Sequence, residues 1–216
     1  MDIVVSLVTG LVAYLLGSVP TGYLVAHARG VDIRTVGSGN IGATNVLRTL
    51  GKPAGIFVLL IDALKGWLAV AVLPAVLLLV LGRGAAASPG TRAVLEILAG
   101  FCVIVGHNYT CWLHFKGGKG IATSAGVLLA LVPWALLIIF VVWVLVFFST
   151  RYVSLASIAA SASLPFASWA THENLTKVMV TGAMAVLAIC KHRANIQRLL
   201  QGTEPRFERK AREATK

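Results

Sequence analysis

Residues 121–148 read IATSAGVLLALVPWALLIIFVVWVLVFF, an apolar run without a charged residue and with Pro133 near its centre. A helix that crosses a membrane needs about 20 apolar residues, so the run is long for one span and short for two. Proline removes a backbone donor and ends or kinks a helix. The way this run is divided therefore determines the number of spans and the side of the membrane on which the C-terminus lies.

The composition of the whole chain is that of a membrane protein. Of its 216 residues, 57% are hydrophobic and only 12% are charged. Soluble domains carry roughly 25% charged residues. Five more apolar runs cover residues 3–26, 54–81, 93–112, 153–170 and 176–190. We expect an all-α integral membrane protein that forms a single transmembrane domain over residues 1–216, and a first run that is not cleaved, because Met1-Asp2-Ile3 lacks a basic signal region.

The distribution of Lys and Arg favours a division at Pro133. Two spans there, of about 12 and 15 residues, give seven transmembrane helices. Of the 19 basic residues, 15 then fall on one side, in segments 27–52, 107–120 and 149–152 and after residue 190. Basic residues mark the cytoplasmic side. The N-terminus should therefore lie outside and the C-terminus in the cytoplasm, with a basic tail over 203–216. Nucleic-acid binding is not expected, because the bases are spread over loops and the tail.

Three polar stretches rich in glycine or in basic residues fall on this cytoplasmic side: GSGNIGATN at 37–45, KGGKG at 116–120 and KHRAN at 191–195. Glycine lets the backbone approach an anion, helix N-termini attract negative charge, and Lys or Arg neutralises it. The topology is derived from the distribution of Lys and Arg, and glycines are not used. The finding that all three stretches fall on the same side is therefore independent of the glycine pattern. It predicts a phosphate site at the inner membrane boundary.

Each stretch also has a plain structural interpretation. The first predicts a short interfacial helix over 40–50 with Asn40, Thr44 and Arg48 on one face; it could equally be a glycine-rich turn with ordinary caps. In the second, Lys119 can neutralise one phosphate, or the segment only anchors the chain at the membrane. In the third, His192 and Asn195 are surface neighbours that could act on a hydroxyl, or form a basic helix end.

Two further features lie within the spans. Asp62 and Lys65 are three residues apart in the second run, and ionisable residues inside a membrane are candidates for function. They could also simply neutralise each other. Ser157 is near the cytoplasmic half of its span and could reach a site, although small hydroxyls more often serve helix packing. The cysteines form no CxxC pair, so neither a zinc site nor a disulfide framework is expected.

These motifs together resemble a known family. Residues 17–23 (GSVPTGY), 32–34 (DIR) and 37–45 are similar to the first motif of the bacterial acyl-phosphate-dependent glycerol-3-phosphate acyltransferases, the PlsY family. Residues 106–107 with 115–124 resemble the second motif, and residues 191–202 the third. The segment 62–66 (DALKG) is also similar. The resemblance covers nearly the whole chain, apart from the segment 82–92 and the tail after Phe207.

The resemblance implies a reaction and a location. An acyl phosphate donates its fatty acyl group to the 1-hydroxyl of glycerol-3-phosphate, giving lysophosphatidic acid and inorganic phosphate, in the first acylation of phospholipid synthesis. It implies a seven-helix protein of the bacterial inner membrane with its active site facing the cytoplasm. It also implies that acyl-CoA, cofactors and metals are not used. We expect a monomer whose partners are the two substrates and membrane lipid.

By motif position, the resemblance also implies roles for particular residues. Lys119 and the backbone of Gly117, Gly118 and Gly120 should bind the acyl phosphate, and His192 and Asn195 should position the hydroxyl or stabilise the leaving phosphate. The residues expected to line the glycerol-3-phosphate site are Ser38, Asn40, Thr44, Asn45 and Arg48. Ser38, Lys119, His192 and Asn195 are the candidate catalytic residues, and Lys65 and Ser157 are added as substrate-binding candidates.

Two other classes of protein remain open at this point. A transporter of phosphate or a phosphorylated solute would also place bases near phosphate, but it predicts polar residues toward the outer face and matching halves. A lipid-binding or assembly protein predicts a basic tail but not three separate glycine-rich or basic stretches. An assay of acyl transfer with purified protein separates these classes.

Overall fold

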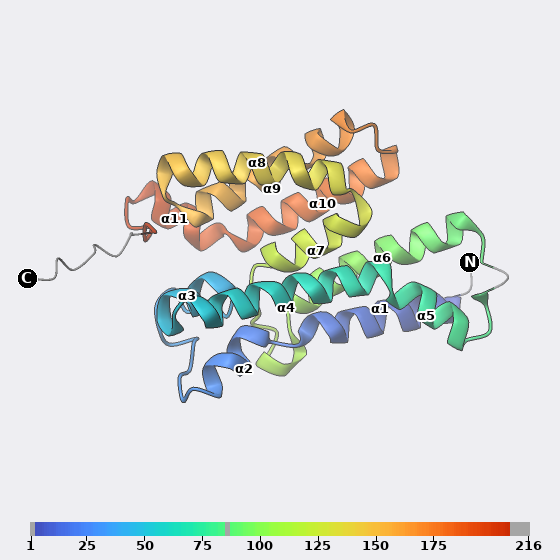
Figure 1. The fold of residues 1–216 in the computed structure, drawn as a ribbon, viewed down its shortest axis with the longest axis horizontal. Coiled ribbons are helices and arrows are strands. Elements are labelled where there is room, and N and C mark those ends of the chain that lie inside the picture. Colours follow the sequence, from blue (N-terminus) through green and yellow to red (C-terminus); the bar gives the residue numbers. More distant parts are fainter. Residues whose placement is uncertain (1–2, 85–86, 208–216) are drawn as a thin grey trace, which may run out of the picture. The chain divides into compact units, whose positions relative to one another are not determined.

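The computed structural model describes residues 3–84 and 87–207, and all regular secondary structure in these ranges is helical (Figure 1). The chain divides into two compact units, Met1–Pro133 and Trp134–Lys216. The expected single transmembrane domain stays a prediction. Of the predicted tail over 203–216, residues 208–216 lie outside the described residues.

The first unit is a bundle built on two helix pairs. Its elements are α1 (Ile3–Ser18), α2 (Thr21–His27), α3 (Ala43–Leu50), α4 (Lys52–Ala71), α5 (Leu73–Val80), α6 (Pro89–Asn108), the short 3-10 helix η2 (Cys111–Leu113) and α7 (Ile121–Leu131). Helix α1 packs along α6, α4 packs along α7, and α3 lies on α4 (Figure 1).

Small residues set the spacing of these pairs. A side chain at Gly126 of α7 would overlap the carbonyl of Ala63 in α4, and one at Gly66 of α4 would overlap the carbonyl of Thr123. In the other pair, Gly17 and Gly106 allow the same close approach of α1 and α6. Close backbone packing through small residues is the usual way in which helices associate in membranes.

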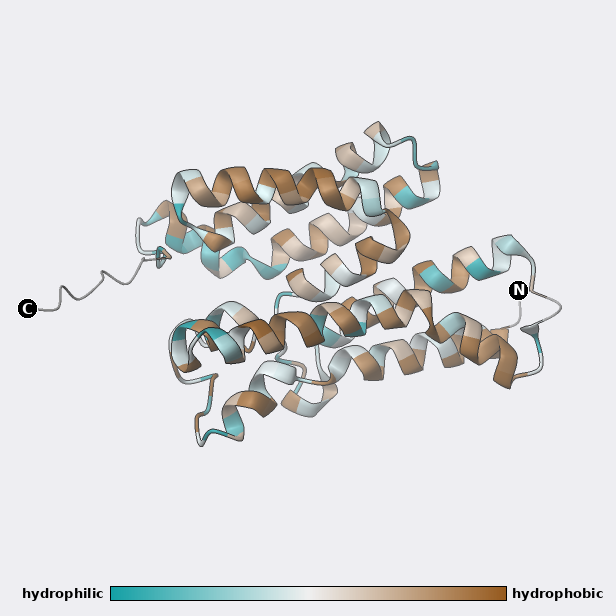
Figure 2. Ribbon diagram, in the orientation of Figure 1, coloured by the Kyte–Doolittle hydropathy of each residue, from teal (hydrophilic) through white to brown (hydrophobic). Residues whose placement is uncertain are grey.

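The second unit contains α8 (Pro133–Thr150), α9 (Val153–Ala170), α10 (Leu175–Lys191) and α11 (Arg193–Leu200). Helices α9 and α10 pack against each other, and α11 contacts both. The side chain of Asn174 begins α10 by accepting a hydrogen bond from the Lys177 amide at 3.0 Å, which satisfies one of the unpaired donors at a helix N-terminus. Hydrophobic residues dominate along α8, and hydrophilic residues gather where α10 meets α11 (Figure 2).

The structure confirms a protein with several apolar helices long enough to cross a membrane. Among the described residues there are five candidate spans, or six if α10 and α11, bent by 57°, are one. The run 121–148 is divided at Pro133 as expected, into α7 with 11 residues and α8 with 18. Helix α7 is apolar but short for a span.

The predicted span over 3–26 is confirmed as one candidate span, Ile3–His27, although its helix is interrupted between Ser18 and Thr21, around Pro20. Two other predicted boundaries were wrong. The run 54–81 is not one helix but α4 and α5, which meet at Val72 just before Pro74. In both runs the proline cannot donate the backbone hydrogen bond that a continuous helix requires. The helix expected over 40–50 begins only at Ala43, after Gly42 in extended conformation.

Candidate functional site

The first glycine-rich stretch is shaped by the side chain of Asn45, which is only 3% exposed. Its Oδ1 accepts a hydrogen bond from the Ser38 amide at 3.0 Å. Its Nδ2 donates to the carbonyls of Val36 at 3.0 Å, Asn40 at 2.9 Å and Ile33 at 3.2 Å. Both ends of the amide are thus used inside the loop. Asn45 holds the loop on which Ser38 and Asn40 lie, and its direct contact with a substrate stays a prediction.

The other predicted residues of this stretch are partly open to solvent. Asn40 lies before helix α3, so the expectation that it shares a helix face with Thr44 and Arg48 was wrong; its Oδ1 instead accepts from the Gly42 amide at 2.8 Å. Thr44 and Arg48 do lie one turn apart on α3. Ser38 and Arg48 are exposed, and Asn40 and Thr44 are half-buried. Their functional groups can therefore meet a soluble ligand.

An ion pair fixes the segment that precedes this loop. The guanidinium of Arg34 donates to the Asp32 carboxylate at 2.7 and 2.9 Å and lies 4.9 Å from the centre of the Tyr23 ring. These hydrogen bonds from the Arg34 side chain, with one from its backbone, lower the pKa of Asp32 to about 2. The pair is therefore charged throughout the physiological range and ties the segment to α2.

The second stretch packs tightly on the end of α6. The Gly117 amide donates to the Asn108 carbonyl at 3.2 Å, and the Gly118 amide donates to the His107 carbonyl at 3.0 Å. A side chain at Gly117 would overlap the His107 carbonyl, and one at Gly118 would overlap the His107 ring. The backbone amides of Gly117 and Gly118 were expected to bind the acyl phosphate. In this structure both amides donate to carbonyls of the protein, and the two glycines permit the close approach of the loop to α6.

Lys119 and the start of α7 are the parts of this loop that remain suited to an anion. Gly120 precedes α7 with a φ of 76°, a left-handed conformation that favours glycine. The first amides of a helix have no partner within it and attract negative charge. Lys119, which is half-buried, stands directly before them. A lysine and a helix start together are a suitable environment for one phosphate group.

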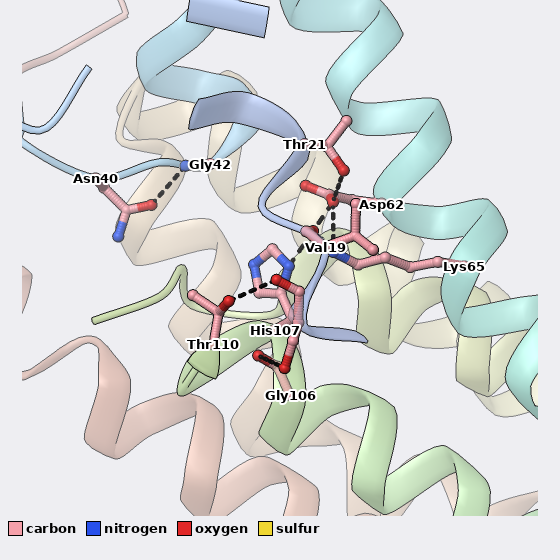
Figure 3. A network of polar contacts seen from close by, with 10 residues as sticks. Val19, Thr21, Asn40, Gly42, Asp62, Lys65, Gly106, His107 and Thr110 are labelled. Atoms are coloured by element: carbon pink, nitrogen blue, oxygen red, sulfur yellow. Dashed lines mark hydrogen bonds and ion pairs between the residues drawn. The ribbon is translucent and has the colours of Figure 1, made fainter. Parts of the chain in front are cut away.

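A buried polar network lies below these loops (Figure 3). The Lys65 ammonium lies 2.8 Å from Asp62 Oδ1 and also donates to the Val19 carbonyl at 3.0 Å. Thr21 donates its hydroxyl to the same Asp62 oxygen at 3.0 Å, and His107 Nδ1 lies 3.7 Å from it. Asp62, Lys65 and His107 are all at most 5% exposed. Lys65, predicted to bind substrate, is thus engaged with the protein in this structure.

The third stretch belongs to the second unit and has its own hydrogen bonds. His192 Nδ1 lies 2.7 Å from the Ala188 carbonyl. If Nδ1 carries the proton, as that contact requires, Nε2 is the acceptor, which is the form a general base needs. Asn195 Nδ2 donates to Glu204 Oε1 at 2.6 Å, and Arg198 donates to Glu204 Oε2 at 2.7 Å. Both His192 and Asn195 are buried.

Glu204 is held as a carboxylate. Burial raises its pKa, but the Ser154 hydroxyl nearby and the hydrogen bonds from Asn195 and Arg198 outweigh burial and leave the pKa below its ordinary value. Ser157, the other candidate in this unit, donates to the Val153 carbonyl at 2.9 Å and accepts from the Trp143 indole at 3.2 Å. In this structure its hydroxyl therefore joins α8 to α9.

No individual role was predicted for Thr21, His107 or Glu204, although Thr21 and His107 lie in segments that resemble family motifs. Nothing in the local sequence distinguishes Glu204 from the other acids of the tail, because its partner Asn195 becomes a neighbour only when the chain turns at Gly202, whose φ is 70°. Among the described residues, no group of three or more His, Cys, Asp or Glu side chains could hold a metal ion.

Comparison with known proteins places these features in a family. A family model described as glycerol-3-phosphate acyltransferase matches residues 7–202. A glycerol-3-phosphate acyltransferase of Desulforudis audaxviator is 50% identical over 94% of this chain and 96% of its own length. One from Geobacter sulfurreducens is 47% identical over 91% of this chain and 95% of its own length.

Solved structures agree. The crystal structure of PlsY (YgiH), an integral membrane glycerol 3-phosphate acyltransferase, in its glycerol 3-phosphate form is 40% identical with a TM-score of 0.81, covering 94% of this chain and 96% of that one. Its lysophosphatidic acid form gives 39% identity and a TM-score of 0.78, over 94% of this chain and 95% of that one. The match runs through all three motif stretches, and the chain belongs to the glycerol-3-phosphate acyltransferase family.

Proposed function

We propose that this protein transfers a fatty acyl group from acyl phosphate to the 1-hydroxyl of glycerol-3-phosphate and releases lysophosphatidic acid and inorganic phosphate. The observation that carries the proposal is the match, over 94% of the chain, to an acyltransferase solved in a glycerol 3-phosphate form and a lysophosphatidic acid form. The polar stretches suit this chemistry, because both substrates carry a phosphate and one of them also carries a lipid tail.

The reaction needs orientation and charge stabilisation more than activation. The hydroxyl oxygen of glycerol-3-phosphate attacks the carbonyl carbon of the acyl phosphate and forms the ester bond. The bond between that carbon and the phosphate oxygen breaks, and its electron pair leaves with the phosphate. Because phosphate is already a good leaving group, preorganised donors and cations can supply most of the catalysis.

We assign roles on this basis. Lys119 and the start of α7 hold the acyl phosphate group and neutralise the charge that develops on the leaving phosphate. Ser38, Asn40, Thr44 and Arg48 bind glycerol-3-phosphate, on a loop held by Asn45. His192 and Asn195 serve the same reaction by orienting the hydroxyl or taking its proton; a phosphate oxygen of the substrate is the other candidate acceptor.

The topology is also a proposal. The helices support seven spans if α7 and α10 both cross the bilayer, with α1 and α2 counted as one span and α4 followed by the short α5. Helix α7 has only 11 residues, so it crosses only where protein or a thinned bilayer covers its ends. We propose an N-terminus outside, a C-terminus in the cytoplasm, an inner-membrane location, and a monomer that works without a cofactor.

The experiment that tests the function compares donors. Purified protein in detergent is given glycerol-3-phosphate with palmitoyl phosphate or with palmitoyl-CoA, and lysophosphatidic acid is measured by mass spectrometry. We expect product with palmitoyl phosphate only. Product from palmitoyl-CoA would overturn the assigned donor. No product from either donor, together with uptake of phosphate by proteoliposomes, would favour a transporter.

A further inference from the structure

The break between α1 and α2 explains why a lysine is buried in a membrane helix. Pro20 has no backbone N–H, so the helix cannot continue through it. The Val19 carbonyl at this break accepts hydrogen bonds from the Thr21 amide and from the Lys65 ammonium, each at 3.0 Å. The Ser18 carbonyl accepts from the Thr110 hydroxyl. Lys65 thus satisfies a carbonyl that the break exposes, and Asp62 balances its charge.

A single carboxylate oxygen joins three helices at this point. Asp62 Oδ1, from α4, lies 2.8 Å from the Lys65 ammonium, accepts the Thr21 hydroxyl of α2 at 3.0 Å and lies 3.7 Å from His107 Nδ1 of α6. Figure 3 shows the side chains of Thr21, Lys65 and His107 converging on Asp62. Thr21 and His107 lie in different helices, and Asp62 lies close to both of them.

Each of these two partners lies directly below one glycine-rich stretch. Gly22, next to Thr21, packs so closely on the Ile41 carbonyl of the first stretch that a side chain there would overlap it. On the other side, the His107 carbonyl accepts the Gly118 amide, and the His107 ring fills the space where a Gly118 side chain would lie. Asp62 is therefore linked to the first loop through Thr21 and its neighbour Gly22, and to the second loop through His107.

We propose that Asp62 and Lys65 are positioning residues, which hold the two glycine-rich stretches of the first unit at a fixed separation. Asp62 acts through its contacts with Thr21 and His107. Lys65 acts by binding the Val19 carbonyl at the break between α1 and α2. The proposal rests on the proposed function, because the two stretches are assigned to two substrates that must meet. A misplacement of about 1 Å in such a site costs about a hundredfold in rate. The competing explanation is that the pair only neutralises charge and stabilises helix packing.

The variants that separate these explanations are Thr21→Val, Asp62→Asn and the double variant D62N/K65M. Thr21→Val removes the hydroxyl that reaches Asp62 with almost no change of shape. The double variant leaves no buried unpaired charge, so it removes the penalty that a single change would cause. Thr9→Val is the matched control, because Thr9 is a fully buried hydroxyl of α1 that belongs to neither loop.

Two measurements are made on each variant. The first is the kinetics of acyl transfer together with the unfolding midpoint. We expect D62N/K65M to regain most of the midpoint lost by Asp62→Asn while kcat/KM stays at least about tenfold below wild type. Thr21→Val should lower kcat/KM, Thr9→Val should not, and Thr21→Val with Asp62→Asn should be no worse than Asp62→Asn alone, because both cut the same link.

The second measurement needs no activity. Spin labels are placed at Arg29, in the turn after α2, and at Lys116, the first residue of the second stretch, both exposed, after the native cysteines are replaced by alanine. We expect the distance distribution to broaden in Thr21→Val and D62N/K65M and to stay narrow in Thr9→Val. An unchanged distribution, or wild-type kinetics in D62N/K65M, would overturn the positioning role. If wild type itself makes no lysophosphatidic acid, the proposed function fails, and the spin-label result still decides the positioning.

Discussion

Asn45 shows how much of the first loop depends on one side chain. Its amide group makes one hydrogen bond as acceptor and three as donor, all to the backbone of residues 33–40. Asn45→Asp has nearly the same shape but loses every donor and places a charge against those carbonyls. Buried groups that lose their partners cost about 1–3 kcal/mol. We expect KM for glycerol-3-phosphate to rise more than KM for acyl phosphate.

The matched control for Asn45→Asp is Thr49→Ala, at an exposed position of the same helix. It should leave both KM values as in wild type. If Asn45→Asp changed kcat alone, with both KM values unchanged, Asn45 would not act by shaping the loop.

Because of Glu204, the stability of the folded protein is expected to depend on pH. The pKa of Glu204 is lowered in the folded protein: burial raises it, but the nearby Ser154 hydroxyl and the hydrogen bonds from Asn195 and Arg198 outweigh burial. A group with a lowered folded pKa stabilises the protein above its unfolded pKa, and this stabilisation is lost as the pH falls through the folded value. The difference in unfolding midpoint between wild type and Glu204→Gln should be largest at neutral pH and shrink below pH 4.5, the ordinary pKa.

A difference in midpoint that stayed constant from pH 7 to pH 4 would contradict this role of the Glu204 charge. The same variant should also lower kcat, because the Asn195 amide loses the carboxylate that orients it. Glu204→Asp serves as the second variant: it keeps the charge but shortens the reach, so it should keep the pH dependence better than it keeps activity.

At the scale of the elements, the contact of α4 with α7 leaves no room for an added side chain at Gly66 or Gly126. Gly126→Ala places a methyl group on the Ala63 carbonyl, and overpacking of this kind costs about 1–3 kcal/mol. Because α7 carries the Lys119 loop at its start, we expect a lower unfolding midpoint and a lower kcat/KM. Gly182→Ala in α10 is the control, since the nearest atom to its new methyl, Pro165 Cβ, is 4.0 Å away. Equal effects of the two variants would show that the close contact is not needed.

The elements also show where prediction from sequence succeeds. Apolar runs predicted the positions of most of the helices, because a bilayer requires long apolar segments; the sides on which the basic loops lie stay a prediction. Helix breaks were predicted at Pro133 but not at Pro20 or Pro74, while Pro165 lies inside α9 without ending it. A proline always removes one donor, but whether the helix breaks depends on what replaces that bond. At the break around Pro20 the Val19 carbonyl accepts from Lys65, which is 46 residues away in the chain and is not indicated by the local sequence.

The candidate site was predicted unevenly for a similar reason. Composition is enough to identify loops that suit phosphate, and the family resemblance then names Ser38, Arg48 and Lys119 within them as candidate site residues. The partners of Asn45, Asp62 and Asn195 are carbonyls or side chains that only the folded chain brings near. Local sequence therefore could not separate residues that face a substrate from residues that hold a loop.

For the whole molecule, the proposed topology makes a direct prediction. Single cysteines are introduced at Arg29, Lys116 and Gln197, and at Arg92 and His172, all exposed positions, in a chain without native cysteines. An impermeant maleimide applied to right-side-out vesicles should label only Arg92→Cys and His172→Cys until the vesicles are opened. Labelling of Arg29→Cys and Lys116→Cys from opposite sides would contradict a common face for the first two stretches.

The proposed function requires one chemical event, the transfer of an acyl group between two phosphate-bearing molecules. Phosphorus-31 NMR of purified protein with acyl phosphate and glycerol-3-phosphate follows both products in one sample. We predict equal amounts of lysophosphatidic acid and inorganic phosphate from wild type, and neither from a folded Lys119→Ala variant. Phosphate released without lysophosphatidic acid, or near-normal turnover in Lys119→Ala, would contradict the account.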